Sequence, residues 1–179
     1  GQLYMYELGT GKVKNRITTG DWNVTEVLRT DEKARSMFLL GVGREKGRDP
    51  YFAHLYKVGF DGKSLQLLTP EDANHDVQLS KSGKYFVDVY SKPDMPPTAV
   101  LRDENGKQLA VVEKADISKL TAEGWKPPVP ITVKARDGQT DLFGAIVRGV
   151  AAGIDIARAA SCRETDVPDP ARTLRGGER

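Results

Sequence analysis

The two histidines, His54 and His75, are the residues whose chemistry first suggests a site. A catalytic relay needs a histidine held between a nucleophile and an orienting carboxylate. Asp72 and Asp76 lie near His75, but His75 stands at a turn into a strand, and no G-x-S-x-G motif occurs in the sequence. The histidines are about 20 residues apart and lack the further ligands that a metal requires. We expect a structural or surface role for both, with no catalytic residue and no metal site.

Two glycine-containing stretches resemble nucleotide-binding loops only in part. The stretch from Gly41 to Gly47 misses the G-x-G-x-x-G spacing by one residue and precedes a strand instead of a helix. Gly62-Lys63-Ser64 resembles the end of a phosphate loop, but Lys57 stands where that motif needs glycine. We interpret the first as an inter-strand loop and the second as a hairpin turn, and we predict no cofactor.

Other chemically suggestive residues also have plain structural explanations. Trp22 and Trp125 could offer a ligand platform, but we expect them to pack at a sheet edge or a domain junction. Asn23-Val24-Thr25 is a glycosylation sequon that we expect to be unused. Cys162 has no partner histidine in a credible fold, and we do not interpret it as a nucleophile. The charged loop from Arg44 to Asp49 is expected to be solvated.

Composition excludes several classes of function. The chain has 179 residues, with 27 basic and 25 acidic residues interleaved, so nothing indicates a nucleic-acid partner. No stretch approaches the roughly 18 apolar residues of a membrane span. The single cysteine excludes an intrachain disulfide. Residues 1–6 already have a strand pattern, from which we expect a truncation upstream.

Period-two alternation of apolar and polar residues dominates the first 112 residues and predicts short antiparallel strands. Asp61-Gly62 and Asn105-Gly106 are typical of tight hairpin turns. Residues 92–97, which include three prolines, are expected to form a loop. The strands are predicted at 3–8, 13–18, 24–29, 36–42, 51–60, 64–68, 76–79, 85–90, 98–102 and 108–112.

The strand pattern repeats at an offset of about 50 residues, which is typical of four-stranded propeller blades. Leu3-Tyr4 recurs as Leu55-Tyr56, and Ile17-Thr18-Thr19 recurs as Leu67-Leu68-Thr69. Val24 recurs near Val77, and Met37-Phe38-Leu39 recurs near Tyr85-Phe86-Val87. A single blade cannot bury both of its faces, so blades must stack. The fold class predicted is mainly all-β, a partial propeller of about two and a half blades.

The pattern changes after Glu113. Residues 115–123 predict a short helix with Asp116 as a possible N-cap. Residues 124–130 contain three prolines and predict a stiff connector that lies outside any sheet. Residues 131–135 and 140–146 predict one more hairpin, so we place a domain boundary near Pro130. From Leu142 onward there are six arginines and no lysine, and we interpret 147–179 as an atypical tail, helical at 151–160 and disordered at its end. Our hypothesis is that this tail is foreign to the parent protein.

Several segments of residues 2 to about 146 resemble bacterial dipeptidyl peptidase IV, a serine exopeptidase family within the prolyl oligopeptidases. The segments that carry the resemblance are 20–27, 41–52, 54–58, 67–76, 83–88, 114–120, 124–128 and 133–138. In that family an eight-bladed propeller precedes an α/β-hydrolase domain, and together they release N-terminal dipeptides, usually after proline. The resemblance implies that 1–130 are the closing blades with a linker, and that 131–146 are the first hairpin of the hydrolase.

The resemblance also implies what this chain lacks. The family's serine, aspartate and histidine, its oxyanion donor and its paired glutamates for the substrate's amino terminus all fall outside the matching residues. We therefore expect the chain to be inactive alone, and to be the part of a peptidase that limits substrate access. The partners implied are peptide substrates and the chain's own hydrolase domain. The parent is expected to be periplasmic or secreted, and it can be a homodimer.

A second interpretation, from another class of function, stays open. The chain could belong to a stand-alone β-propeller that binds other proteins without catalysis. A downstream Gly-Trp-Ser-Tyr-Gly-Gly sequence would favour the peptidase, and its absence would favour the binding module. In either case two and a half blades leave open strand edges, so we expect the isolated chain to associate.

Overall fold

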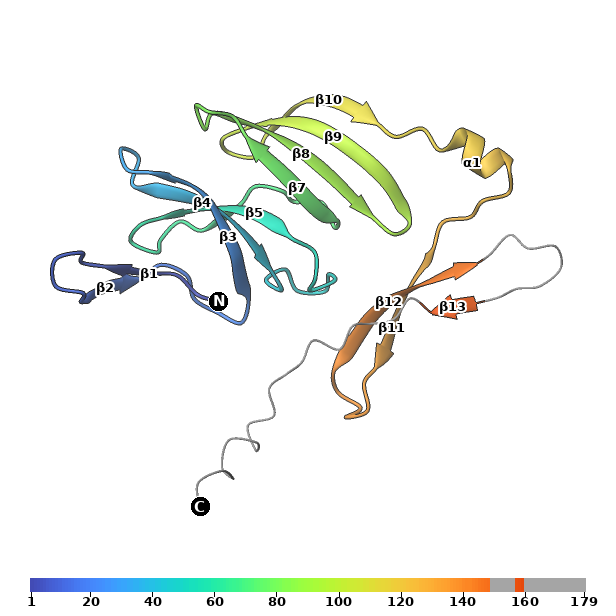
Figure 1. Cartoon of the computed structure of the whole chain (residues 1–179), viewed down its shortest axis with the longest axis horizontal. Helices are drawn as coiled ribbons and strands as arrows, with labels where there is room; N and C mark the ends of the chain where they lie inside the picture. The colour runs from blue at the N-terminus through green and yellow to red at the C-terminus, as the bar shows by residue number, and fades with distance from the viewer. Residues whose placement is uncertain (149–156, 160–179) are drawn as a thin grey trace, which may run out of the picture. The chain divides into compact units, whose positions relative to one another are not determined.

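The structure is a computed structural model in which residues 1–148 and 157–159 are described. The chain divides into two compact units, Gly1–Pro127 and Pro128–Arg179. In the first unit a two-stranded sheet is followed by two four-stranded antiparallel sheets (Figure 1). We call β3–β6 the N-terminal blade and β7–β10 the C-terminal blade. The prediction of about two and a half four-stranded blades is confirmed.

The strands of each blade follow one another in chain order across the sheet. The strands of the first unit are β1 Tyr4–Tyr6, β2 Val13–Arg16, β3 Asn23–Asp31, β4 Ser36–Val42, β5 His54–Gly59, β6 Gln66–Leu67, β7 Asn74–Leu79, β8 Tyr85–Lys92, β9 Met95–Asp103 and β10 Gln108–Lys114.

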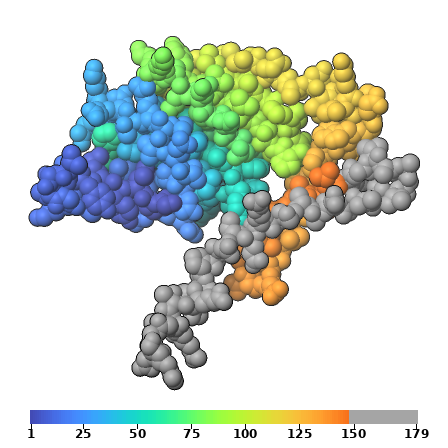
Figure 2. Space-filling view, viewed as in Figure 1, coloured from blue at the N-terminus to red at the C-terminus, as the bar shows by residue number. Residues whose placement is uncertain are grey.

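The core of the first unit consists of two apolar clusters, one on each face of the N-terminal blade. Strand β4 contributes to both because successive side chains of a strand point to opposite faces. Met37 and Leu39 join the cluster that also holds Ile17. Phe38 joins the cluster that also holds Phe86 of the C-terminal blade. The blades are therefore held together by apolar side chains between their faces, and Figure 2 shows the surfaces of successive blades adjoining one another.

An asparagine makes the same contact at the start of each blade. The Oδ1 atom of Asn23 accepts a hydrogen bond from the amino group of Gly1 at 3.0 Å, and the next amide, that of Val24, donates to the Gly1 carbonyl at 2.9 Å. One repeat later, Asn74 Oδ1 accepts from the Ala53 amide at 3.0 Å, and the His75 amide donates to the Ala53 carbonyl at 3.0 Å. Each blade therefore begins by bonding a residue that precedes a strand of the earlier sheet, Gly1 before β1 and Ala53 before β5.

A buried threonine also recurs. The amide of Leu3 donates to Thr18 Oγ1 at 2.8 Å, and the amide of Leu55 donates to Thr69 Oγ1 at 2.9 Å. Thr18 therefore corresponds to Thr69, and the sequence alignment that placed Thr18 opposite Leu68 is wrong by one residue. The apolar pattern alone could not fix this register, because the conserved feature of the geometry is a hydroxyl that satisfies a buried amide.

The hairpin turn between the third and fourth strands of each blade rests on the preceding blade. Gly62 and Gly106 have φ values of +77° and +85°, as the predicted tight turns require. A Cβ atom on Gly62 would lie 2.7 Å from the Arg16 carbonyl oxygen, and one on Gly106 would lie 2.5 Å from that of Leu68. Both positions therefore need glycine for conformation and for space.

Two details of the first unit differ from the sequence predictions. Strand β9 begins at Met95, so part of the predicted loop 92–97 is strand. The prolines of this segment are tolerated because they occupy the start of the strand, where the pairing with β8 is irregular. Helix α1 is shorter than predicted, Ser118–Ala122, and its N-cap position is Ile117 instead of Asp116. Asp116 Oδ1 nevertheless accepts a hydrogen bond from the Ser118 amide at 2.8 Å.

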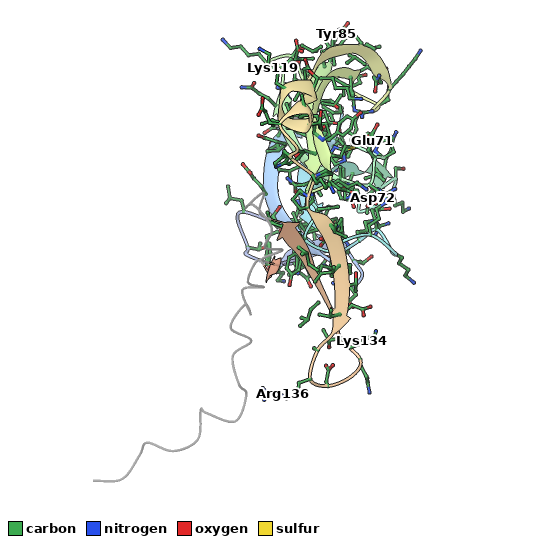
Figure 3. All side chains as sticks on the ribbon, turned by 90° about the vertical axis from the view of Figure 1, so that its right-hand side faces the viewer. Glu71, Asp72, Tyr85, Lys119, Lys134 and Arg136 are labelled. Atoms are coloured by element: carbon green, nitrogen blue, oxygen red, sulfur yellow. The ribbon has the colours of Figure 1, made fainter. Side chains whose placement is uncertain are left out.

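The second unit is a three-stranded antiparallel sheet of β11 Val129–Lys134, β12 Asp141–Arg148 and β13 Ala157–Ala159. Figure 3 labels Lys134 at the end of β11 and Arg136 in the turn that follows. The predicted hairpin is confirmed, but the exclusion of Pro130 from a sheet is wrong. Pro130 pairs with Ala145 in β11, which is an edge strand, where the missing amide is tolerated.

The predicted helix at 151–160 is wrong over Ala157–Ala159, which form β13. These residues pair with Ile146, Val147 and Arg148 of β12, and the sheet supplies the hydrogen bonds that a helix would supply. The remainder of that prediction, including Cys162 and the tail, lies outside the described residues. Within the described residues, no helix is long and apolar enough to cross a membrane.

Candidate functional site

A buried polar network lies between the N-terminal and C-terminal blades. It consists of His54 from β5, Glu71 from the segment between β6 and β7, His75 from β7, Asp88 from β8 and Arg102 from β9. Figure 3 labels Glu71 beside Asp72 in the first unit, with Tyr85 marking the start of β8. Within a mainly apolar interface, such groups must satisfy one another.

Asp88 is the centre of the network. Its Oδ1 atom lies 2.9 Å from His75 Nδ1, and its Oδ2 atom accepts from Arg102 Nε at 2.9 Å. The side chains of Asp88 and His75 are fully buried. The carboxylate is thus held between two groups that can carry positive charge, which compensates for its removal from water.

Arg102 joins three parts of the unit through its guanidinium group. Besides Asp88, it donates from Nη2 to Glu71 Oε1 at 2.7 Å and from Nη1 to the Gly106 carbonyl at 3.1 Å. Burial opposes its charge, but the bonds and charges of Glu71 and Asp88 outweigh burial, so the pKa of Arg102 is raised. The guanidinium remains charged and fixes the segment before β7 against the C-terminal blade.

The network also brings together the two histidines that the sequence left apart. The His54 and His75 rings have centroids 5.0 Å apart, because the His75 amide bonds the residue that precedes His54. Both side chains are buried, so the surface alternative for them is wrong. The structural role for the pair remains a prediction.

The Asp88–His75 pair resembles two thirds of a catalytic relay, but its third position is occupied. His75 Nε2 lies 3.1 Å from the main-chain carbonyl oxygen of Glu71, where a relay would hold a nucleophilic hydroxyl or thiol. A carbonyl oxygen cannot be activated as a nucleophile by losing a proton. The geometry therefore supports positioning of the backbone and gives no route to acyl transfer.

Glu71, His75 and Asp88 are close enough together to bind a metal ion, since one possible ligand atom of each lies within 4.8 Å of the others. The sequence did not predict such a cluster. However, Arg102 donates to both carboxylates at hydrogen-bonding distance. A guanidinium group is therefore the cation that this set already holds, and we assign no metal to it.

His54 is the member of the network with an incomplete set of partners. Its Nδ1 atom lies 3.0 Å from the Thr69 carbonyl oxygen, while Nε2 has no hydrogen-bond partner among the described residues. Burial lowers the pKa of His54, and the neighbouring His75 lowers it further. The Thr69 carbonyl can only accept, so the ring proton of a neutral His54 resides on Nδ1.

The glycines of the nucleotide-like stretch have packing roles. A Cβ atom on Gly41 would lie 2.3 Å from the Trp22 ring, so glycine there makes room for the indole. Gly43 and Gly47 have positive φ values in the loop, and Gly62 forms the turn described above. The interpretation as an inter-strand loop and a hairpin turn agrees with this geometry.

The charged loop from Arg44 to Asp49 is more tightly attached than the solvated loop we expected. Tyr56 donates its hydroxyl hydrogen bond to Glu45 Oε1 at 3.0 Å, and Arg48 Nη1 donates to the Glu71 carbonyl at 3.3 Å. The Arg44 guanidinium lies 5.4 Å from the centre of the Trp22 ring. Glu45 and Arg48 are partly buried, so the solvated-loop interpretation is wrong for these two side chains, whereas Arg44 is exposed as expected.

The two tryptophans differ in surroundings. Trp22 is buried in the apolar cluster with its ring 5.1 Å from that of Tyr56, as expected for packing at a blade. Trp125 lines a shallow cavity of about 230 Å³ with the proline-rich β8–β9 hairpin and Ile117. Asn23 of the sequon is engaged through Oδ1 in the contact with Gly1.

The fold and the inter-blade contacts define part of a β-propeller. Residues 1–97 match the family described as the dipeptidyl peptidase IV (DPP IV) N-terminal region, which is more than half of the 179 residues. The chain belongs to this family.

Relatives and solved structures agree with this assignment. Dipeptidyl peptidase 4 of Arthroderma otae is 28% identical over 96 residues, which are 52% of this chain and 12% of that protein. Probable dipeptidyl-aminopeptidase B of Ajellomyces dermatitidis is 36% identical over 75 residues, 39% of this chain and 8% of that protein. This chain therefore spans about an eighth or less of these relatives.

Two crystal structures share the fold. Porphyromonas gingivalis dipeptidyl peptidase 4 superposes with a TM-score of 0.64 at 22% identity, covering 82% of this chain and 20% of that one. A putative dipeptidyl aminopeptidase IV from Bacteroides ovatus gives 0.58 at 29% identity, covering 77% and 19%.

Proposed function

We propose that this chain is the C-terminal part of the propeller of a serine dipeptidyl peptidase, joined to the first strands of its hydrolase domain. The observation that carries the proposal is the match of residues 1–97 to the dipeptidyl peptidase IV N-terminal region, on blades that repeat the same contacts. The parent enzyme would release N-terminal dipeptides, typically after proline. Its catalytic serine, aspartate and histidine would be supplied by residues other than those of this chain.

We also propose that the C-terminal blade is the last blade of the propeller. The third strands of the two blades can be aligned from their pairing with the second strands. In the N-terminal blade Tyr56 pairs with Leu39, and in the C-terminal blade Val100 pairs with Asp88, so Tyr56 corresponds to Val100. Ala53 then corresponds to Pro97. A proline has no amide to donate to a further asparagine, so the contact that begins each blade cannot be repeated there.

The carbonyl of Pro97 supports the same placement. In the two earlier repeats the corresponding carbonyls, of Gly1 and Ala53, accept from the first strand of the following blade. The Pro97 carbonyl accepts instead from Ala115, at 2.9 Å. The residue that follows β10 therefore takes the hydrogen bond that a next blade would use, which supports our proposal of blades with their linker at 1–130 and the start of a hydrolase domain at 131–146.

The proposed role of the blades is steric. A propeller beside a hydrolase admits unfolded or short peptide termini and excludes folded proteins from the active site. We propose that the parent is periplasmic or secreted, and that it can form a homodimer. The chain alone would have no peptidase activity, because it would lack the nucleophile and the relay.

The reading frame downstream of this chain tests the proposal. We expect it to encode a strand–turn–helix with a G-x-S-x-G nucleophile turn, followed by an aspartate and then a histidine. A downstream frame with no such turn, or with further blades, would overturn the peptidase and leave the binding module. The extended protein should also cleave a short peptide faster than the same N-terminal sequence fused to a folded domain, and equal rates would contradict the steric role.

A further inference from the structure

His75 contacts two groups that accept hydrogen bonds. Its Nδ1 atom faces the Asp88 carboxylate at 2.9 Å, and its Nε2 atom faces the Glu71 carbonyl at 3.1 Å. A neutral imidazole has one N–H donor, whereas an imidazolium has two. Both contacts are satisfied only when His75 carries both protons.

His54 has no place for a second proton. Its Nδ1 proton is used by the Thr69 carbonyl, and a proton on Nε2 would find no acceptor among the described residues. The His75 ring lies 5.0 Å away between centroids and would carry the same charge. A buried donor without a partner and a like charge nearby both destabilise the folded state.

The charged groups around the pair come from every neighbouring element. Arg48 and Glu45, from the loop between β4 and β5, act on His54 with opposite signs. Asp88 and the Tyr90 ring of β8 contact His75, and Arg102 reaches it through Asp88. Apart from Glu45, none of these groups favours a charge on His54, and the Glu45 carboxylate accepts from Tyr56.

The pair also lies where the two blades are joined. His75 begins the contact of β7 with the third strand of the N-terminal blade, since its amide donates to Ala53, the residue before His54. We propose that His54, packed against His75, is a pH-sensitive switch: the interface between the blades is closed while His54 is neutral, and it loosens when acidification charges His54. The switch belongs to the blade interface and does not depend on the peptidase proposal.

The direction of the pH effect follows from the folded and unfolded states of His54. Its pKa in the folded chain lies below the value of about 6.5 for an unfolded chain. The unfolded state therefore binds the proton first as the pH falls. The contribution of His54 to stability is complete above about pH 6.5 and decreases below it, until the folded form is also protonated at His54.

Urea unfolding of the chain between pH 5 and pH 7.5 tests the proposal, with His54→Asn as the matched variant. Asparagine keeps an N–H for the Thr69 carbonyl and has no site for a second proton. We expect the unfolding equilibrium constant of the wild type to increase by up to about tenfold per pH unit below 6.5, and that of His54→Asn to increase much less. The same acid sensitivity in both proteins would overturn the switch.

Two further measurements keep the test decisive if His54→Asn does not fold. Long-range ¹H–¹⁵N spectra of the wild type at pH 7 should show His54 protonated on Nδ1 alone; a proton on Nε2 of His54 at this pH would overturn the proposal. Hydrogen exchange of the backbone amides is measured at pH 7 and at pH 5.5 and corrected for the intrinsic chemical exchange rate. The His75 amide should then lose more protection on acidification than the Val58 amide within β5. Equal losses would show that the blade interface is not the part that responds.

Discussion

The Nδ1 atom of His75 and the Oδ1 atom of Asp88 lie 2.9 Å apart, and neither side chain is accessible to solvent. The two residues lie diagonally across the paired strands β7 and β8, since His75 pairs with Tyr90 and Asp88 pairs with Val77, and Arg102 holds the other oxygen of Asp88 from β9. This polar contact crosses the C-terminal blade and continues through Glu71 into the segment from the N-terminal blade. The network therefore fixes how the second blade is placed on the first.

Replacing the central carboxylate should destabilise the chain strongly. Asp88→Asn keeps the shape but leaves Arg102 and His75 without their negative partner, at a cost of about 3–5 kcal/mol in the free energy of unfolding. Urea denaturation measures this cost. Asp76→Asn, at an exposed position of β7, is the control and should change stability by less than about 0.5 kcal/mol. Similar effects for both variants would contradict the role of Asp88.

The recurring threonine contact predicts that two distant substitutions act alike. Thr69→Val and Thr18→Val keep the volume but remove the acceptor for the buried amides of Leu55 and Leu3, so each should cost about 1–3 kcal/mol in urea denaturation. Thr25→Val, at an exposed position of β3, is the control, expected within about 0.5 kcal/mol of the wild type. A neutral Thr18→Val beside a costly Thr69→Val would show that the repeat does not extend to β1–β2.

Substitutions at two turn glycines allow the cost of backbone strain to be measured separately from the cost of a steric clash. Gly47→Ala introduces a Cβ at a positive φ with nothing within 4 Å, and it should cost about 1–2 kcal/mol. Gly106→Ala carries the same strain and also places Cβ 2.5 Å from the Leu68 carbonyl oxygen, which should add about 1–3 kcal/mol. Thermal or urea unfolding of the two variants gives the comparison. Equal costs would mean that the turn does not rest on the N-terminal blade.

The exposure of the outer strand of the C-terminal blade predicts that copies of the chain associate with one another. Strand β10 is exposed along all seven residues, and among them Val111 is 59% exposed and Val112 is 58% exposed. An edge strand with exposed apolar side chains pairs readily with another chain. Size-exclusion chromatography at increasing concentration should show species larger than a monomer, and a clean monomer at moderate concentration would count against an open blade edge. Val111→Lys should reduce the association.

The strands were predictable because alternation and turn residues are local signals. A continuous apolar run located β4, and Asp61-Gly62 and Asn105-Gly106 located two hairpins whose positive φ values require glycine. The prolines led to the same error twice, because both segments were predicted to lie outside a sheet. Met95–Pro97 and Pro130 belong to strands because an irregular pairing and a sheet edge tolerate a missing amide, and neither condition can be read from a single residue.

The buried network was not predictable in the same way. Asp88 and Arg102 lie in strands with an ordinary alternating pattern, and Glu71 lies in a turn. Only the stacking of two blades brings His54 beside His75. One signal was available: charged residues at inward positions of β8 and β9, where the alternation calls for apolar side chains, indicate that partners must come from elsewhere in the chain.

The most direct test of the account compares the purified 179-residue chain with the same chain extended downstream through its reading frame. Both are assayed with a chromogenic substrate that carries a dipeptide ending in proline. We predict that the extended protein releases the dipeptide and that this chain releases none at the same concentration. Turnover by the 179-residue chain, or none by the extended protein, would contradict the central claim.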